Sequence, residues 1–254
     1  MTRLIDLSVP LGPNPSEQLP LQIDYMDHVQ GGSHLAELVG MDQETLPDCL
    51  GWASERVSAV THTGTHVDAP FHYAPGCAGE SSRTIDQIPL DWFWGPGVCI
   101  PVADGRADQP VAPREVQDFE TSRNLRIAPG TIVLFRTGAA YGCPDFNEQG
   151  RALSRQTVEM LCDRGVRLIG TDSWSIDPSF RVMRERLRLL GPESVWSAHF
   201  TGRQREFCVV EKLFNLASLP PSGFRMTCFP IKLRGASAAW ARPVAWIEEE
   251  FTAC

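Results

Sequence analysis

The 254-residue sequence lacks several features that would define a function at once. It has no apolar run near the ~20 residues of a membrane-spanning helix, so we expect no membrane partner. It has no cluster of Lys and Arg, and 23 basic against 31 acidic residues give a formal net charge of −8. Such a chain is a poor match for a phosphate backbone, which argues against a nucleic-acid partner. There is no internal repeat, low-complexity tract or charged linker, so we expect one domain over residues 1–254.

The eight cysteines never form a C-x-x-C motif and are spread along the chain. A chain of this length can build a core without disulfides, and a free cysteine is a small residue that is often buried. We therefore expect buried thiols rather than disulfides. Residues 1–6 include charges and begin no long apolar stretch, so we expect no signal peptide. Together these features predict a cytoplasmic protein.

Short β-branched runs bounded by Gly or Pro predict strands, whereas apolar stripes at helical spacing predict helices. We expect strands at residues 4–9, 56–60, 97–102, 131–136, 166–170, 224–233 and 243–247. We expect helices at residues 113–120, 154–164 and 180–190. Ser154 is a candidate N-cap, and Gly165 is a candidate helix end. Strands outnumber helices and do not alternate with them, which favours a mixed α+β arrangement within the α/β class over a doubly wound or barrel fold.

Three of the six histidines fall within residues 62–72, which read HTGTHVDAPFH. The metal-binding side chains of this stretch all have even numbers: His62, His66, Asp68 and His72. A strand would place them on one face. A straight strand would separate His62 from His66 by ~13 Å, too far for both to bind one ion easily. Gly64 permits a bend or bulge that brings the two imidazoles together.

Imidazole and carboxylate donors form a typical site for Zn²⁺ or Mn²⁺. The alternative is a set of ordinary surface or core histidines. We prefer metal binding, because three histidines and Asp68 recur in phase around a glycine and a proline. His199 lies beside Trp196 and Phe200, and its surroundings alone are more typical of a packed core residue.

Residues 62–72 resemble the H-x-G-T-H-x-D-x-P-x-H signature of the cyclase-like metal-dependent hydrolase family. That family includes bacterial kynurenine formamidases, isatin hydrolases and proteins named polyketide cyclases. Further similar segments are residues 5–8 (IDLS), 133–138 (VLFRTG), 170–177 (GTDSWSID) and 230–235 (PIKLRG). His199 and Glu211, twelve residues apart, match the family's distal His and Glu. The resemblance therefore covers nearly the whole chain.

The resemblance implies a single β/β/α swivelling-type domain that forms a homodimer or homotetramer. It implies one or two bound divalent ions, zinc or manganese. The metal ligands that it implies are His62, His66, Asp68, His199 and Glu211. Asp68 would serve both a first metal position and a second or alternative one. His72 would be the proton donor and acceptor.

The proline-rich segment at residues 10–20 departs from the family. Kynurenine formamidases carry a Trp there that packs on the aryl substrate, whereas this segment has no aromatic residue. N-formylkynurenine is therefore not the substrate that we expect first. The candidates for substrate contact are His28, Phe71, Trp94 and Trp174, and each of the aromatic residues is also a candidate for the core. Asp172 can orient a metal ligand by accepting a hydrogen bond, or it can cap a turn.

We expect a hydrolase that cleaves an amide or ester bond in a small aromatic or cyclic molecule, such as a lactone, a cyclic amide or an N-acyl compound. A divalent ion held by imidazole and carboxylate activates water and polarises a carbonyl group. The alternative is a metal-dependent cyclase that acts on an aromatic polyketide-like or other natural-product intermediate. In that case His72 would remove a proton beside the carbonyl to promote aldol closure, lactonisation or dehydration. A metal-storage or sensor protein is a third reading, but no DNA-binding module or basic face supports it.

Overall fold

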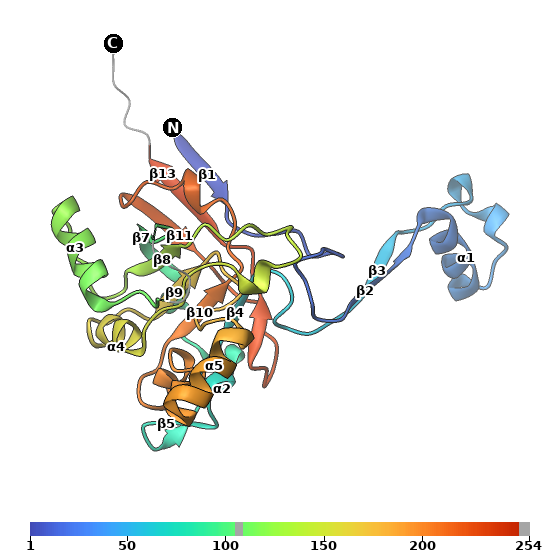
Figure 1. The fold of residues 1–254 in the computed structure, drawn as a ribbon. Coiled ribbons are helices and arrows are strands. Elements are labelled where there is room, and N and C mark those ends of the chain that lie inside the picture. The colour runs from blue at the N-terminus through green and yellow to red at the C-terminus, as the bar shows by residue number, and fades with distance from the viewer. Residues whose placement is uncertain (105–108, 249–254) are drawn as a thin grey trace, which may run out of the picture. The chain divides into compact units, whose positions relative to one another are not determined.

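The computed structural model describes residues 1–104 and 109–248 (Figure 1). The chain divides into two compact units. The smaller unit contains residues 18–60, and the larger contains residues 1–17 together with the chain from Thr61 onward. All residues of the family signature belong to the larger unit. The expectation of one domain over residues 1–254 stays a prediction.

The smaller unit consists of an antiparallel strand pair, one α-helix and two short 3-10 helices, Gln43–Thr45 and Pro47–Cys49. Strand β2 (Leu21–Met26) pairs antiparallel with β3 (Ser54–Ala59), and α1 (His28–Val39) lies between them in the sequence. A capping box starts α1: Asp27 accepts from the backbone of Gln30, and the Gln30 side chain accepts from the backbone of Asp27. Sequence patterns missed this helix because two glycines disfavour it. One of them, Gly31, is required, since a Cβ there would lie 1.9 Å from the Trp52 carbonyl oxygen.

In the described residues, the larger unit is built on a nine-stranded sheet in the order β1-β13-β11-β7-β8-β9-β10-β4-β12. The strands, in that order, are Thr2–Asp6, Val244–Glu248, Phe224–Thr227, Trp94–Pro101, Ile132–Arg136, Leu168–Thr171, Cys208–Glu211, His66–Asp68 and Ala238–Trp240. Strands β7 to β10 run parallel, and the other neighbours are antiparallel. The mixed sheet confirms the predicted mixed α+β fold class.

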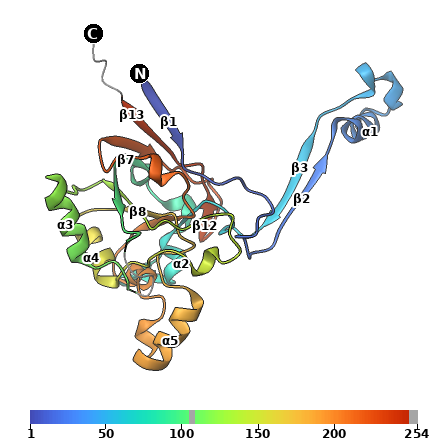
Figure 2. The ribbon, with the colours of Figure 1, turned by 45° about the horizontal axis from the view of Figure 1, so that its top comes forward.

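Side chains on the two faces of the sheet pack into two separate hydrophobic cores. Val133 and Phe135 of β8 face α3 (Pro113–Arg123) and α4 (Arg155–Asp163), in one buried cluster. Leu134 belongs to the cluster on the opposite face. Figures 1 and 2 show α3 and α4 side by side. The predicted cap of α4 is present, since the Ser154 hydroxyl accepts a hydrogen bond from a first-turn backbone N–H.

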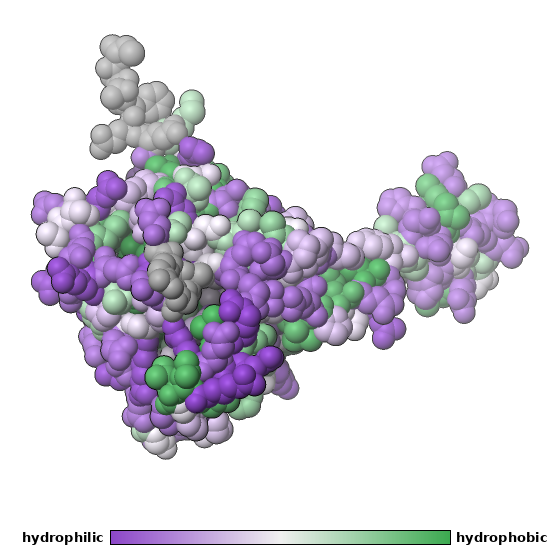
Figure 3. Space-filling view, in the orientation of Figure 1, coloured by the Kyte–Doolittle hydropathy of each residue, from purple (hydrophilic) through white to green (hydrophobic). Residues whose placement is uncertain are grey.

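Three shorter elements and one longer helix complete the larger unit. These are α2 (Pro70–Tyr73), β5 (Gly76–Cys77), β6 (Glu80–Ser81) and α5 (Phe180–Leu190). The bounds predicted for α5 are confirmed. An apolar patch lies beside a strongly hydrophilic one on the surface over this helix (Figure 3). The predicted strand at residues 4–9 is too long, because Asp6 accepts two hydrogen bonds from Ser8 and turns the chain there.

The seven cysteines in the described part of the chain are free thiols, and five of them are buried. This agrees with the prediction of buried thiols. Within residues 1–104 and 109–248, no helix has both the length and the apolar character needed to cross a membrane.

Candidate metal centre

The centre begins where β4 meets β10. His66 lies opposite Glu211 in the antiparallel register, and Asp68 lies opposite Val209. Directly opposed residues share a face of the sheet, so both carboxylates and the His66 imidazole point the same way. His66 Nε2 lies 3.3 Å from Asp68 Oδ1 and 3.7 Å from Glu211 Oε2. One oxygen or nitrogen from each of these three buried residues lies within 4.8 Å of the others, close enough to bind one ion.

His62 reaches this group through a turn. Residues 61–65 form no strand, and Gly64 within them has a φ of 63°, a value that glycine adopts without strain. The turn brings His62 Nδ1 to 2.8 Å from Asp68 Oδ1, and the rings of His62 and His66 to 5.0 Å between centroids. The predicted bend at Gly64 is present. The idea of one long strand face is wrong, because the strand covers only His66–Asp68.

His72 joins the group from a helix. Pro70 starts α2, and His72 lies one position before its last residue, Tyr73. The centroid of the His72 ring lies 4.1 Å from that of His62 and 5.8 Å from that of His199. His72 is half-buried. A turn, a strand and a short helix therefore bring together the four residues that the sequence motif singled out.

His199 closes the centre from the other side. Its Nε2 atom lies 3.6 Å from Glu211 Oε1 and 3.7 Å from Asp68 Oδ2. Its Nδ1 atom lies 2.7 Å from Asp177 Oδ2, and Asp177 also accepts from the backbone of Ala198 and His199. A ring that donates from Nδ1 presents Nε2 to an ion. Sequence analysis missed Asp177, although the residue ends the family-like segment 170–177.

A similar contact orients His66. Its Nδ1 atom lies 2.8 Å from the Gly64 carbonyl oxygen. Because a carbonyl oxygen can only accept a hydrogen bond, Nδ1 must carry the hydrogen. Its Nε2 atom therefore faces the carboxylates with a free lone pair when the ring is neutral. On the carboxylate side, Glu211 Oε1 accepts from the backbone of Ile176 at 3.0 Å. Hydrogen bonds to the protein therefore orient three candidate metal ligands, His66, His199 and Glu211.

Several buried polar atoms at the centre lack a hydrogen-bond partner. In the described residues they are His66 Nε2, both carboxylate oxygens of Asp68 and His199 Nε2. Buried polar atoms without a partner cost about 1–3 kcal/mol each and are rare in folded proteins. A divalent cation among them would satisfy all four. The residues present therefore fit a divalent metal ion.

The charges and burial of these side chains favour protons on the atoms that would bind an ion. Burial lowers the pKa of His199, but the Asp177 and Asp68 carboxylates outweigh it and raise that pKa to about 10. Burial and the Asp68 charge raise the pKa of Glu211. Burial likewise lowers the pKa of His66, and the Asp68 carboxylate more than offsets this, so that the pKa is raised. A bound cation would displace such protons.

His72 shows the opposite behaviour. Burial, above all, lowers its pKa to about 4, with the neighbouring imidazoles acting in the same direction and Asp68 against it. At neutral pH this imidazole is uncharged. It can therefore accept a proton.

The other predicted residues are spread over the fold. Phe71 is exposed and precedes His72 in α2. Trp94 is exposed at the start of β7 and lies over the guanidinium of Arg225. The sheet order places β7 four strands from β4. His28 is the first residue of α1 in the smaller unit.

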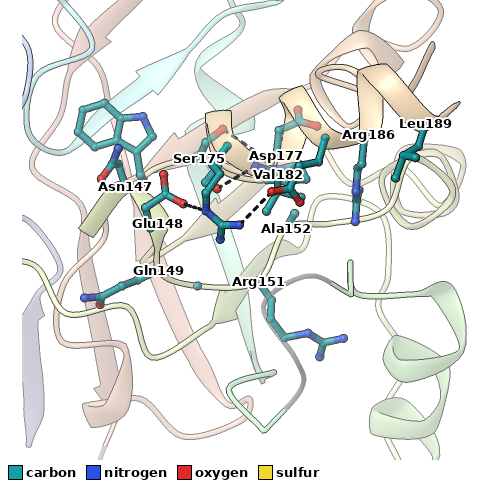
Figure 4. Close-up of a pocket in the computed structure, with 16 residues that line it drawn as sticks. Asn147, Glu148, Gln149, Arg151, Ala152, Ser175, Asp177, Val182, Arg186 and Leu189 are labelled. Carbon is teal, nitrogen blue, oxygen red and sulfur yellow. Dashed lines mark hydrogen bonds and ion pairs between the residues drawn. The ribbon is translucent and has the colours of Figure 1, made fainter. Parts of the chain in front are cut away.

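Asp172 and Trp174 follow β9 but have different surroundings. Asp172 accepts hydrogen bonds from the backbone and hydroxyl of Thr137 and from the backbone of Gly138. These contacts fit the turn-capping alternative, and the carboxylate found to orient a histidine is Asp177. Trp174 and Asp177 line a cavity of about 600 Å³ beside α5. Figure 4 shows this cavity with Glu148 and Asp177 at its lining, and Arg181 contacts Glu148 and Glu185 there.

A mixed sheet that carries a buried cluster of imidazoles and carboxylates, with unpartnered atoms on His66, Asp68 and His199, is typical of a metal-dependent enzyme. Comparison with known proteins makes this class more specific. Residues 5–178 match the model of the family described as "Putative cyclase". The chain belongs to this cyclase-like metal-dependent hydrolase family, as the resemblance of residues 62–72 implied.

Two relatives in sequence are named kynurenine formamidase. The protein of Maricaulis maris (strain MCS10) is 30% identical over 198 residues, which cover 78% of this chain and 82% of the relative. That of Salinibacter ruber (strain DSM 13855 / M31) is 30% identical over 186 residues, 72% of this chain and 75% of the relative. Among solved structures, isatin hydrolase A from Ralstonia solanacearum aligns with a TM-score of 0.74 at 25% identity, covering 97% and 92% of the two chains. An isatin hydrolase bound to the product analogue thioisatinate gives a TM-score of 0.77 at 19% identity, covering 98% and 93%, and supports the fold.

Proposed function

We propose that this protein hydrolyses an amide or ester bond of a small aromatic or cyclic molecule, with a divalent ion at the centre described above. The observation that carries the proposal is the convergence of unpartnered atoms from His66, Asp68 and His199 beside Glu211. The two kynurenine formamidase relatives support amide chemistry in particular. The substrate class that we propose is an N-acyl compound, a cyclic amide or a lactone.

The proposed metal ligands are His62, His66, Asp68, His199 and Glu211. When bound, a divalent ion would supply a Lewis acid and a water molecule of lowered pKa. Nitrogen and oxygen donors without thiolates suit zinc or manganese. Two donor groups share Asp68: one adds His66 and Glu211, and the other adds His62 and His72. Two such groups are compatible with one ion or with two.

We propose His72 as the proton donor and acceptor. Its lowered pKa of about 4 leaves the ring neutral and able to take a proton during attack on the carbonyl. It can then deliver that proton to the leaving nitrogen or oxygen. The ring lies at the partly exposed edge of the centre, next to His62 and 5.0 Å from the ring of Trp196. That edge is where a substrate could approach.

Within the larger unit, we propose contacts between the substrate and Phe71, Trp94 and Trp174, whereas a role for His28 in the smaller unit stays a prediction. Two of these proposals have support in the larger unit: Phe71 is exposed next to His72, and Trp174 lines the cavity of Figure 4. The segment of residues 10–20 has no aromatic side chain to stack on an aryl group. We therefore do not propose N-formylkynurenine as the preferred substrate. A homodimer or homotetramer in the cytoplasm remains our proposal for the protein's state.

A cyclase is the second candidate, favoured by the family's description. In this alternative, His72 removes a proton from the carbon beside the carbonyl, and the product forms by ring closure or dehydration. The two reactions differ in the fate of water. Turnover in ¹⁸O-water must label the product of a hydrolase, whereas a carbon–carbon cyclase adds no such label.

The proposal is tested by elemental analysis of protein purified without added metal, followed by assays on lactones, cyclic amides and N-formyl anilines. We expect a bound divalent ion and turnover of at least one class, with loss of both after chelation. Metal binding without turnover of any acyl substrate would overturn the hydrolase proposal and leave the cyclase and the storage or sensor alternatives.

A further inference from the structure

A buried ion pair lies directly behind the metal centre. Lys212 is 1% exposed, and its Nζ atom lies 2.8 Å and 2.9 Å from the two carboxylate oxygens of Glu17. Glu17 has a side chain that is 2% exposed. Neither residue contributes to the ligand set, yet Lys212 directly follows Glu211. A buried charge pair of this kind needs a reason, because its desolvation offsets much of its attraction.

The pair holds the turn that carries two ligand candidates. Lys212 Nζ donates to the His62 carbonyl oxygen at 3.0 Å, and Glu17 Oε2 accepts from the Gly64 backbone at 2.7 Å. Thr65 Oγ1 donates to the Lys212 carbonyl oxygen at 2.7 Å. Three hydrogen bonds therefore fix residues 62–65, which include the candidate ligand His62 and directly precede the candidate ligand His66. All three bonds come from the Glu17–Lys212 pair or from the Lys212 backbone.

The Lys212 backbone is itself held in an uncommon conformation. Its φ is 56°, in the left-handed region that costs a side-chain-bearing residue about 1–3 kcal/mol. Its N–H donates to the Ser173 carbonyl oxygen at 3.1 Å, and its ammonium lies 3.9 Å from the centre of the Trp174 ring. Such a conformation persists only where the surroundings determine it. The segment after Glu211 is thus tied to the turn before His66.

We propose that the Glu17–Lys212 pair positions His62 and His66 around Asp68 and thereby sets the affinity for the divalent ion. Both are positioning residues, because each acts through the backbone of the 62–65 turn and touches no proposed ligand side chain. The inference rests on the proposed function, since it concerns the same centre. Orienting partners of metal ligands typically change affinity by about 10–100-fold.

The test compares metal binding in three variants. Lys212→Met keeps the length and apolar stem of the side chain but removes its charge and its bond to the His62 carbonyl. The double variant Glu17→Gln/Lys212→Met leaves no unpaired buried charge, so it decides the matter if the single variant does not fold. Arg164→Met is the matched control, because Arg164 pairs with Glu120 at 2.8 Å between α3 and α4, outside the centre. Zn²⁺ affinity is measured by competition with a chromogenic chelator, and the visible spectrum of bound Co²⁺ reports ligand geometry.

We expect both Lys212 variants to bind Zn²⁺ about 10–100-fold more weakly and to show altered Co²⁺ bands. The control should keep wild-type affinity and bands even if its melting temperature falls. Wild-type affinity and bands in the double variant would overturn the inference and leave the proposed function intact. Absence of Zn²⁺ and Co²⁺ binding in the wild-type protein would instead remove the proposed function itself.

Discussion

The metal centre has two halves that differ in burial and in how firmly the protein holds them. The inner half comprises His66, Asp68, His199 and Glu211, and the outer half comprises His62 and His72. Every inner side chain is buried, whereas both outer rings are partly exposed. Protein acceptors fix the Nδ1 atoms of His66 and His199. Of the outer rings, His62 contacts the Ser237 hydroxyl at 3.3 Å, and the ring centroids of His62 and His72 lie 4.1 Å apart.

On the basis of this difference, we propose different roles for the two halves. Fixed, unpartnered donors suit an ion that must stay bound through many turnovers. In the outer half, His62 is a proposed ligand, whereas the neutral His72 imidazole can accept a proton and pass it on. Asp68 connects the halves, because its Oδ1 atom lies 2.8 Å from His62 Nδ1 and 3.3 Å from His66 Nε2. Substitutions in the inner half should therefore weaken metal binding, whereas substitution of His72 should reduce catalysis without loss of metal.

Asp68→Asn should have the largest effect, since it removes a charge that both halves share. We expect kcat/KM to fall by about a thousandfold or more, equivalent to about 4 kcal/mol in the activation barrier. Bound metal should be lost at the same time, as elemental analysis of the purified variant will show. A variant that retains metal and activity would show that Asp68 is not a ligand.

His72→Gln should reduce kcat by about 10²–10⁴-fold, the usual contribution of a positioned acid or base. The metal content should remain at the wild-type level, because we place His72 outside the ligand set. Steady-state kinetics and elemental analysis on one preparation measure both quantities. Loss of metal in parallel would make His72 a ligand in the group it forms with His62 and Asp68.

Asp177→Asn tests the inner half without touching the ion. Asp177 accepts from His199 Nδ1 at 2.7 Å, and an amide in its place can present a donor to the ring. We expect Zn²⁺ affinity to fall by about 10–100-fold, measured by chelator competition. Unchanged affinity would mean that the orientation of His199 does not depend on this carboxylate.

Asp172→Asn should have the smallest effect on the centre. Its hydrogen bonds go to Thr137 and Gly138, so we expect unchanged Zn²⁺ affinity. Loss of charge-assisted bonds should lower the free energy of unfolding by about 1–3 kcal/mol, as measured by urea denaturation. A drop in metal affinity would restore the original alternative that Asp172 orients a ligand.

Sequence patterns predicted the parts of this fold that depend on local signals. The helix at residues 180–190 and the strand at residues 131–136 have Gly, Pro or a capping residue at or near their ends, and the structure contains both. The smaller unit was not predicted as a compact unit. Its helix α1 contains glycines, which disfavour a helix in sequence patterns but allow close packing against the segment around Trp52. Local sequence patterns do not show contacts between segments that are distant in the chain.

The candidate site divides in the same way. Residues 62–72 are close in sequence, so one motif could indicate four of the side chains. The segment of residues 170–177 was singled out, but the contact of Asp177 with His199 was not, and the Glu17–Lys212 pair was beyond reach because the two residues are 195 apart in sequence. The sheet order sets β10 between β9 and β4, which brings the segment before Lys212 beside the strands that flank Asp177 and the 62–65 turn. Long-range register is the physical information that a single sequence does not display.

The central claim is that the inner half binds a divalent ion, and titration of ion-free protein with Zn²⁺ at several pH values tests it most directly. His199 has a pKa raised to about 10, so at neutral pH its ring holds a proton that an ion must displace. We therefore predict saturable binding whose affinity rises about tenfold per pH unit for each displaced proton, below that pKa. Absence of binding, or binding that neither pH nor Asp68→Asn alters, would contradict the account.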